Sequence, residues 1–185
     1  MHALRLLWLL RILCLWLPSY VHQDEFMQGP EITSGSFLPW EFHHDTPARS
    51  VTPIYLLTWL PLSLTRWLGG GPWLRLAASR LPFLLMSFMG DIAISGTGGS
   101  QLHSLLYASA WPTLTLLTRS FSNGVEACCL WTCLWLLGRR PSSWRSPTCS
   151  AVLGCLCTLA IFTRFSFAFF AIPLLLCSPS TRGRI

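Results

Sequence analysis

The chain has 185 residues, of which 52% are hydrophobic and only 11% are charged. Soluble domains carry about one-quarter charged residues, so this composition excludes an ordinary water-soluble protein and indicates an integral membrane protein. The net charge of +6 comes from 13 arginines and no lysine. These arginines flank apolar runs instead of forming a basic stripe, and no nucleic-acid-binding motif accompanies them, so we expect no nucleic-acid partner.

The first apolar run is Ala3–Leu17, which carries Arg5 and Arg11 and is followed by Pro18. At 1.5 Å per residue it reaches about 22 Å, short of the ~30 Å hydrocarbon core. Residues 1–18 therefore fit either a signal peptide or a first membrane helix. The residues that follow, Pro18-Ser19-Tyr20, make a poor cleavage site, which favours a retained anchor.

Residues 19–50, called the first loop below, form the one long polar segment, and five of the seven acidic residues lie in it. His22, Asp24 and Glu25 stand together where the chain leaves the first apolar run. A carboxylate beside low-dielectric lipid is more basic and an imidazole can orient it, so these three residues are candidate catalytic groups. A helix cap at Asp24, or a solvated loop, explains the same residues.

Residues 51–177 predict further membrane helices, and residues 178–185 a polar tail, in a single membrane domain covering residues 1–185. The candidate runs are Val51–Leu68, Leu81–Ile94, Leu102–Leu117, Val125–Leu137 and Ala151–Cys177. Arginines precede the first loop, and Arg66, Arg75 and Arg80 follow the second run, so the positive-inside rule places the acidic loop on the lumenal side. The predicted fold is an all-α, polytopic membrane helical bundle.

Several charged or polar residues lie within or beside the apolar runs. Arg119, Asn123 and Glu126 are spaced i, i+4 and i+7, which puts them on one face if the segment is helical. Charges at membrane depth are costly unless they pair or line a wet cavity, so this stripe is a candidate binding surface; a helix end with Arg119 at the interface also explains it. Asp91 and Arg164 either pair with each other or each face a substrate phosphate or sugar hydroxyl.

Cysteine and tryptophan residues suggest structure more than chemistry. Seven of the eight cysteines lie inside apolar runs, which indicates buried small hydrophobic residues. Cys128, Cys129 and Cys133 have no second pair or nearby histidine at ligand spacing, so we expect no metal site. Trp40 fits either an interfacial belt or a sugar-stacking role.

Residues 20–31, reading YVHQDEFMQGPE, resemble the His-Pro-Asp-Glu-Phe-Phe-Gln-x-Pro-Glu signature of the glycosylphosphatidylinositol (GPI) mannosyltransferases of glycosyltransferase family 22. Residues 39–42 (PWEF) and 49–51 (RSV) resemble the type that adds the fourth mannose. Residues 118–123 (TRSFSN) with Glu126 are similar to the family's Thr-Arg-Thr-Phe-Ser-Asn and Glu, and residues 163–165 (TRF) fall where its Ala-Arg-Pro lies. Gln23, Met27 and Phe165 depart from the pattern.

The resemblance implies a C-type glycosyltransferase of the endoplasmic reticulum membrane. Such an enzyme transfers mannose from dolichyl phosphate mannose to a lipid-linked GPI glycolipid at the lumenal face, by inverting displacement at the sugar C1, without a cofactor. The resemblance implies that Asp24 is the base, with Glu25 beside it and His22 orienting it. It also implies that Arg119, Asn123 and Glu126 help build the substrate site and that Arg164 meets the donor phosphate.

The resemblance covers nearly the whole chain but only the N-terminal part of the family's length. The leading hypothesis is therefore a mannosyltransferase of GPI-anchor biosynthesis, or its catalytic-loop portion. The alternative is a truncated, non-catalytic membrane relative that binds the lipid-linked glycan or partner enzymes. A family 22 enzyme acting on the dolichol-linked N-glycan precursor is a third possibility, against which residues 39–42 argue.

Overall fold

The protein is built from helices. The computed structural model describes residues 2–19, 21–22, 24–27, 29–34, 39–43, 45, 50–138 and 147–176, and no β-strand occurs among them, which confirms the all-α class for these residues. The elements in chain order are α1 (His2–Leu15), α2 (Asp24–Met27), α3 (Pro30–Ser34), η1 (Trp40–Phe42), α4 (Thr52–Ile54), η2 (Tyr55–Trp59), α5 (Leu60–Trp67), α6 (Pro72–Gly96), α7 (Gln101–Ser109), α8 (Trp111–Thr115), α9 (Ser122–Gly138), α10 (Pro147–Thr163), η3 (Phe165–Phe167) and α11 (Ala168–Leu176). The elements η1 and η3 are 3-10 turns, and η2 is a π-helical turn.

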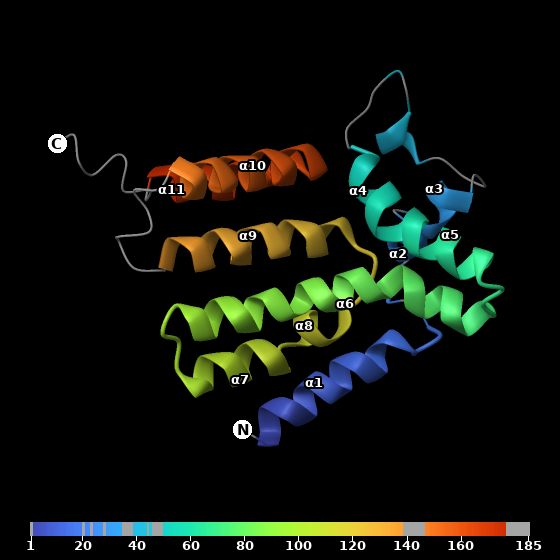
Figure 1. Ribbon diagram of the computed structural model, residues 1–185, viewed down its shortest axis with the longest axis horizontal. Coiled ribbons are helices and arrows are strands. Elements are labelled where there is room, and N and C mark those ends of the chain that lie inside the picture. The colour runs from blue at the N-terminus through green and yellow to red at the C-terminus, as the bar shows by residue number, and fades with distance from the viewer. Residues whose placement is uncertain are drawn as a thin grey trace.

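Helix α6 is the central element and packs against α1, α5, α7 and α9 (Figure 1). Gly71 precedes it in an extended conformation and Pro72 occupies its first turn, where a missing N–H costs little. Its 25 residues reach about 37 Å at the rise of an α-helix. Within the described part of the chain, it is the one helix long and apolar enough to cross a membrane. The run predicted at Leu81–Ile94 thus forms part of a longer helix.

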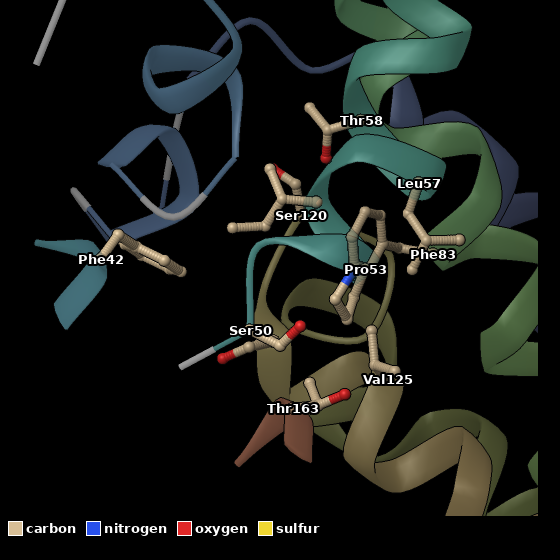
Figure 2. Close-up of a pocket in the computed structure, with 11 residues that line it drawn as sticks. Phe42, Ser50, Pro53, Leu57, Thr58, Phe83, Ser120, Val125 and Thr163 are labelled. Atoms are coloured by element: carbon tan, nitrogen blue, oxygen red, sulfur yellow. The ribbon is translucent and has the colours of Figure 1, made fainter. Parts of the chain in front are cut away.

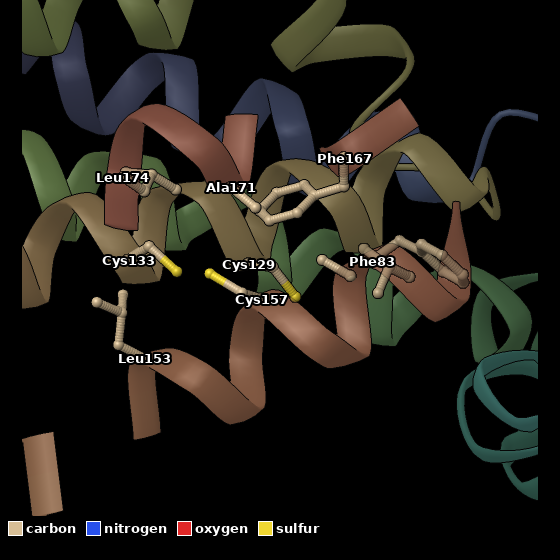
Figure 3. Packing of buried hydrophobic residues seen from close by; sticks show 10 residues of the cluster. Phe83, Cys129, Cys133, Leu153, Cys157, Phe167, Ala171 and Leu174 are labelled. Carbon is tan, nitrogen blue, oxygen red and sulfur yellow. The ribbon is translucent and has the colours of Figure 1, made fainter. Parts of the chain in front are cut away.

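Helices α10, α9, α6 and α7 lie as successive rows, with α1 crossing obliquely beside them (Figure 1). The main core lies between α6, α9, α10, η3 and α11 and includes Phe83, Cys129, Cys133 and Cys157. Figure 3 shows the sulfur atoms of Cys133 and Cys157 pointing toward each other between α9 and α10. All three cysteines are buried free thiols, which confirms for them the prediction that cysteine serves here as a small hydrophobic residue.

The run predicted at Val51–Leu68 forms a helix in three pieces, α4, η2 and α5, of 3, 5 and 8 residues. The wider π-helical turn ends just before Pro61, which has no N–H to donate to the carbonyl of Leu57. These pieces lie at the same end of the molecule as α2 and α3 (Figure 1), and η2 contacts α3. That this run crosses a membrane stays a prediction.

Helix α1 is held against α6 by a buried ion pair. Arg11 Nη1 lies 2.6 Å from Asp91 Oδ2, and Arg11 Nη2 lies 3.3 Å from Asp91 Oδ1. The Arg11 guanidinium also lies 5.2 Å from the ring centre of Phe88 and 5.3 Å from that of Tyr107, within the range of cation–π attraction. Arg11 is fully buried. The interpretation that Asp91 pairs with Arg164 is therefore wrong, because the partner of Asp91 is Arg11.

Candidate functional site

A buried cluster of three charged residues, the Glu25 cluster, fixes the first loop to the helical bundle. Arg80 Nε lies 2.7 Å from Glu25 Oε1, and Arg119 Nη1 lies 3.0 Å from Glu25 Oε2. All three residues are at most 2% exposed. Both carboxylate oxygens of Glu25 are thus bound by guanidinium groups, so this carboxylate is engaged in structure and is not open to a substrate proton.

The same two arginines also bind the chain where it leaves α1. Arg80 Nη1 donates to the carbonyl oxygens of Leu15 at 3.2 Å and Leu17 at 2.5 Å, and Arg80 Nη2 donates to that of Ser19 at 3.3 Å. Arg119 Nη1 donates to the Ser19 carbonyl as well. These carbonyls belong to the last turn of α1 and the residues after it, which have no partner within the helix. Arg80, on the neighbouring helix α6, therefore supplies the hydrogen-bond donors for the carbonyl oxygens at the end of α1.

Arg80 is a residue whose role the sequence reasoning missed. It was counted with Arg66 and Arg75 as a charge on the side of the membrane opposite the first loop, but it binds that loop directly. One signal was present: Arg80, Leu84, Ser87 and Asp91 follow each other at helical spacing on the buried face of α6. Two opposite charges on one buried helical face indicate partners elsewhere in the fold.

Asp24 and His22 lie next to this cluster along the chain. Asp24 is the first residue of α2, and its side chain is outside the described part of the structure. His22 is exposed, and its carbonyl accepts the backbone N–H of Glu25 at 3.0 Å. The carbonyl of Glu25 in turn accepts the Ser120 hydroxyl at 2.8 Å. The backbone directly after Asp24 is therefore bound to the turn before α9, and the backbone before it is bound to Glu25.

A second polar cluster, the Arg164 cluster, joins α9 to the end of α10. The Arg164 guanidinium donates to the side-chain oxygen of Asn123, and its Nε lies 3.7 Å from Glu126 Oε2. Ser166 Oγ donates to Glu126 Oε1 at 2.9 Å. The Arg164 and Glu126 side chains are 27% and 15% exposed, so this cluster is more accessible than the Glu25 cluster. Its members can exchange contacts with each other for contacts with a ligand.

The predicted stripe of Arg119, Asn123 and Glu126 does not exist as one surface. Helix α9 begins only at Ser122, so Arg119 lies in the preceding turn and not one helical turn before Asn123. Arg119 binds Glu25, whereas Asn123 and Glu126 bind Arg164. The stripe therefore splits between the two clusters, and the prediction that one face presents all three residues is wrong.

A pocket of about 370 Å³, opening included, lies between elements that carry the two clusters (Figure 2). Ser120, which binds Glu25, forms part of its wall, and so do Ser122 and Thr163, the neighbours of Asn123 and Arg164 in sequence. The full lining is Phe42, Ser50, Pro53, Ile54, Leu57, Thr58, Phe83, Ser120, Ser122, Val125 and Thr163. Five of these residues carry hydroxyl groups and the other six are apolar, a mixture that is typical of sites for ligands with polar and apolar parts.

A shallower groove adjoins this pocket between α4 and α10, and the two share Ser50, Pro53 and Thr163. The wall along α10 includes Gly154 and Phe162 and is mostly apolar. Trp40, the remaining predicted site residue, lines neither hollow; it is 67% exposed in η1, two residues before Phe42 of the pocket wall. Pocket and groove thus adjoin, with hydroxyl-bearing residues in the wall of the pocket and a mostly apolar wall along α10.

Residues 3–184 match the Alg9-like mannosyltransferase family, so the chain belongs to this family of glycosyltransferases. No solved structure matches the chain.

Individual relatives point to one branch of that family and confirm the resemblance seen in the sequence. GPI mannosyltransferase 4 of Aspergillus oryzae is 34% identical over 201 aligned residues, which cover 97% of this chain and 37% of the relative. Human GPI alpha-1,2-mannosyltransferase 4 is 34% identical over 217 aligned residues, which cover 98% of this chain and 37% of the relative. GPI mannosyltransferase 4 of Drosophila melanogaster is 30% identical over 69% of this chain. The chain thus spans 37% of the length of the first two relatives.

Proposed function

We propose that this chain acts in GPI-anchor biosynthesis as a mannosyltransferase that adds the fourth mannose, using the first loop as its catalytic loop. The observation that carries the proposal is the fixation of Glu25 beside the pocket, through Arg80, Arg119 and Ser120. This fixation holds the backbone of the neighbouring Asp24 next to a pocket wall. The family match and the names of the relatives supply the reaction class.

The proposed reaction is an inverting displacement at C1 of the mannose of dolichyl phosphate mannose. The acceptor hydroxyl oxygen of the GPI precursor forms a bond to C1, the bond from C1 to the phosphate oxygen breaks, and Asp24 takes the hydroxyl proton. His22, next to α2, is assigned the orienting role. Dolichyl phosphate leaves with an added negative charge.

The Arg164 cluster is assigned to that leaving phosphate. Arg164 is partly exposed and bound by Asn123 and Glu126, so its guanidinium is held in one place yet open to an anion. Arginine binds phosphate oxygens through charge-assisted hydrogen bonds, which strengthen as charge develops in the transition state. Glu126 keeps the guanidinium paired when no phosphate is present.

The proposed setting is the membrane of the endoplasmic reticulum, with several spans and the first loop in the lumen. Helix α6 supports membrane insertion, and the apolar groove along α10 suits the hydrocarbon part of a lipid-linked substrate. Arg80 binds the loop, and Arg11 is buried in its ion pair with α6. Arg66 and Arg75 lie on α5 and the start of α6, at the same end of the molecule as α2 and α3 (Figure 1). The positive-inside argument for the lumenal loop therefore rests on Arg5, at the far end of α1. The proposed partners are membrane lipid, the lipid-linked donor and the GPI glycolipid acceptor.

The test is transfer of labelled mannose from dolichyl phosphate mannose to a trimannosyl GPI precursor. Microsomes come from cells that lack the endogenous enzyme and express this chain, either unchanged, with Asp24→Asn, or with Asp45→Asn. Asp45 is an exposed acid of the same loop and serves as the matched control. We expect transfer by the unchanged chain and by Asp45→Asn, and a loss of about 100- to 10,000-fold with Asp24→Asn, the range of general-base catalysis.

Two outcomes would overturn the proposal. Equal loss of transfer in both variants would remove the special role of Asp24. No transfer by the unchanged chain, with the protein present in the membrane, would favour a non-catalytic relative that binds the lipid-linked glycan or partner enzymes.

A further inference from the structure

We propose that Arg80 is a positioning residue for mannose transfer, which acts through Glu25 to fix Asp24 relative to the pocket. This inference rests on the proposed function and names a residue outside the sequence segments that carry the family resemblance. Arg80 lies 55 positions after Glu25 in the chain and reaches it from the buried face of α6.

Arg80 binds four groups on both sides of the point where the chain leaves α1. Its Nε donates a hydrogen bond to the Glu25 carboxylate. Its Nη1 donates to the carbonyls of Leu15 and Leu17, and its Nη2 donates to that of Ser19. The donors of one rigid, planar guanidinium thus set the distance between the end of α1 and the start of α2. Leu17 and Ser19, which lie between them, are held at their carbonyl oxygens while these bonds exist.

Glu25 is also bound to a residue of the pocket wall. Arg119 holds its second carboxylate oxygen, and Ser120, a pocket residue, donates to its backbone carbonyl. Consecutive Cα atoms are about 3.8 Å apart, so the backbone of Asp24 follows any displacement of Glu25. A shift of about 1 Å in a reacting group lowers rates by about 100-fold in other enzymes. Loosening Arg80 is therefore expected to lower the rate of transfer.

Lysine at position 80 separates positioning from charge compensation. An ammonium group restores the positive charge opposite Glu25, but its single nitrogen cannot reach the carboxylate and the three carbonyls in their present places. If Arg80 only neutralises Glu25, Arg80→Lys keeps full activity. If Arg80 positions the loop, Arg80→Lys stays folded but transfers mannose slowly.

The experiment uses the full chain with Arg80→Lys, Arg80→Gln or Glu25→Gln. The matched control is Arg75→Lys, because Arg75 lies on the same helix but is exposed, and its side chain donates to the carbonyl of Gly70. Two quantities are measured: kcat and KM for dolichyl phosphate mannose in microsomes, and amide hydrogen exchange of peptides covering α2 and α3 in detergent. Exchange reports the order of the loop without any requirement for activity.

We expect Arg80→Lys to lower kcat by about 10- to 100-fold while KM for the donor changes less than about threefold, because the Arg164 cluster is untouched. Exchange in α2 and α3 is expected to rise at least about tenfold in Arg80→Lys and in Glu25→Gln, and to stay unchanged in Arg75→Lys. Glu25→Gln supplies the second measurement if Arg80→Gln does not fold.

The outcomes distinguish this inference from the proposed function. If the unchanged chain transfers no mannose, the proposed function fails, and the positioning role fails with it if exchange is also unchanged in Arg80→Lys and Glu25→Gln. If the unchanged chain is inactive but amide exchange is faster in Arg80→Lys and Glu25→Gln, Arg80 holds the first loop in place without a role in transfer. That result also overturns the positioning role. If the unchanged chain is active and Arg80→Lys keeps its kcat, Arg80 is only structural.

Discussion

The ion pair between Arg11 and Asp91 gives a sharp test of how the helices are joined. Replacing Asp91 by leucine leaves a fully buried guanidinium with no carboxylate beside it. The carbonyl of Ser87, 3.4 Å from Arg11 Nη1, remains as an acceptor, and Arg11 Nε has no hydrogen-bond partner among the described residues. Removing one partner of a buried pair costs about 3–5 kcal/mol, and this incomplete compensation places Asp91→Leu in that range.

The assay is equilibrium unfolding of the full chain in detergent for the two single variants and for the double variant Arg11→Leu with Asp91→Leu. The double variant replaces both charges by apolar groups, so we expect it to be within about 1–2 kcal/mol of the unchanged chain. The control is Arg5→Leu, an exposed position on the same helix, with an expected change of at most about 0.5 kcal/mol.

The reasoning would be refuted if the stability losses of the two single variants were additive. If the two single variants each lose little and the double variant loses their sum, Arg11 and Asp91 do not depend on each other, and helix α1 is held by apolar packing alone. A loss of stability in the Arg5 control as large as that in Asp91→Leu would likewise show that the measurement reports any change of charge and not this pair.

Three further substitutions have defined outcomes. A Cβ at Gly90 would overlap the Tyr107 ring, which is held in place because its hydroxyl donates to a backbone carbonyl at 2.8 Å. Gly90→Ala should therefore lower the free energy of unfolding by about 1–3 kcal/mol. Gly154→Ala is the control, because a Cβ there meets open space and should cost nothing. Glu126→Gln breaks a partly exposed pair and should cost at most about 1 kcal/mol of stability, yet lower mannose transfer at least about tenfold; unchanged transfer would contradict its assignment. Phe83→Ala should cost about 3–5 kcal/mol, because Phe83 is 4% exposed in the main core, and a loss below about 1 kcal/mol in denaturant titration would contradict that packing.

Sequence reasoning predicted the helical class and the family, and it correctly singled out several charged residues inside apolar segments. Asp91 and Arg119 were suspected because unpaired charge in an apolar setting is costly, and both are buried in ion pairs. The motif resemblance located the loop that carries Asp24 and Glu25. These features are local in sequence, so a motif or a composition rule can find them.

The pairings themselves could not be predicted, because they join distant segments. Arg11 meets Asp91 across 80 positions, and Arg119 meets Glu25 across 94. The spacing of Arg119 and Asn123 suggested one helical face, but the helix begins at Ser122, and helix starts are among the least certain features of a sequence. Helical periodicity says which residues share a face and nothing about which helix lies opposite.

The contacts of Arg80 and Arg119 with the first loop also set an order for biosynthesis. Ser19 and Arg119 are 100 positions apart, and at about 5–20 residues per second the second follows the first by about 5–20 s. Arg80 follows Glu25 by 55 positions and Arg119 follows it by 94, so the Glu25 carboxylate first has neither guanidinium partner and then only Arg80. The loop is translated early but is fully fixed only after Arg119 has been made, so a chain whose synthesis stops before residue 119 leaves the loop more open to proteases and chaperones.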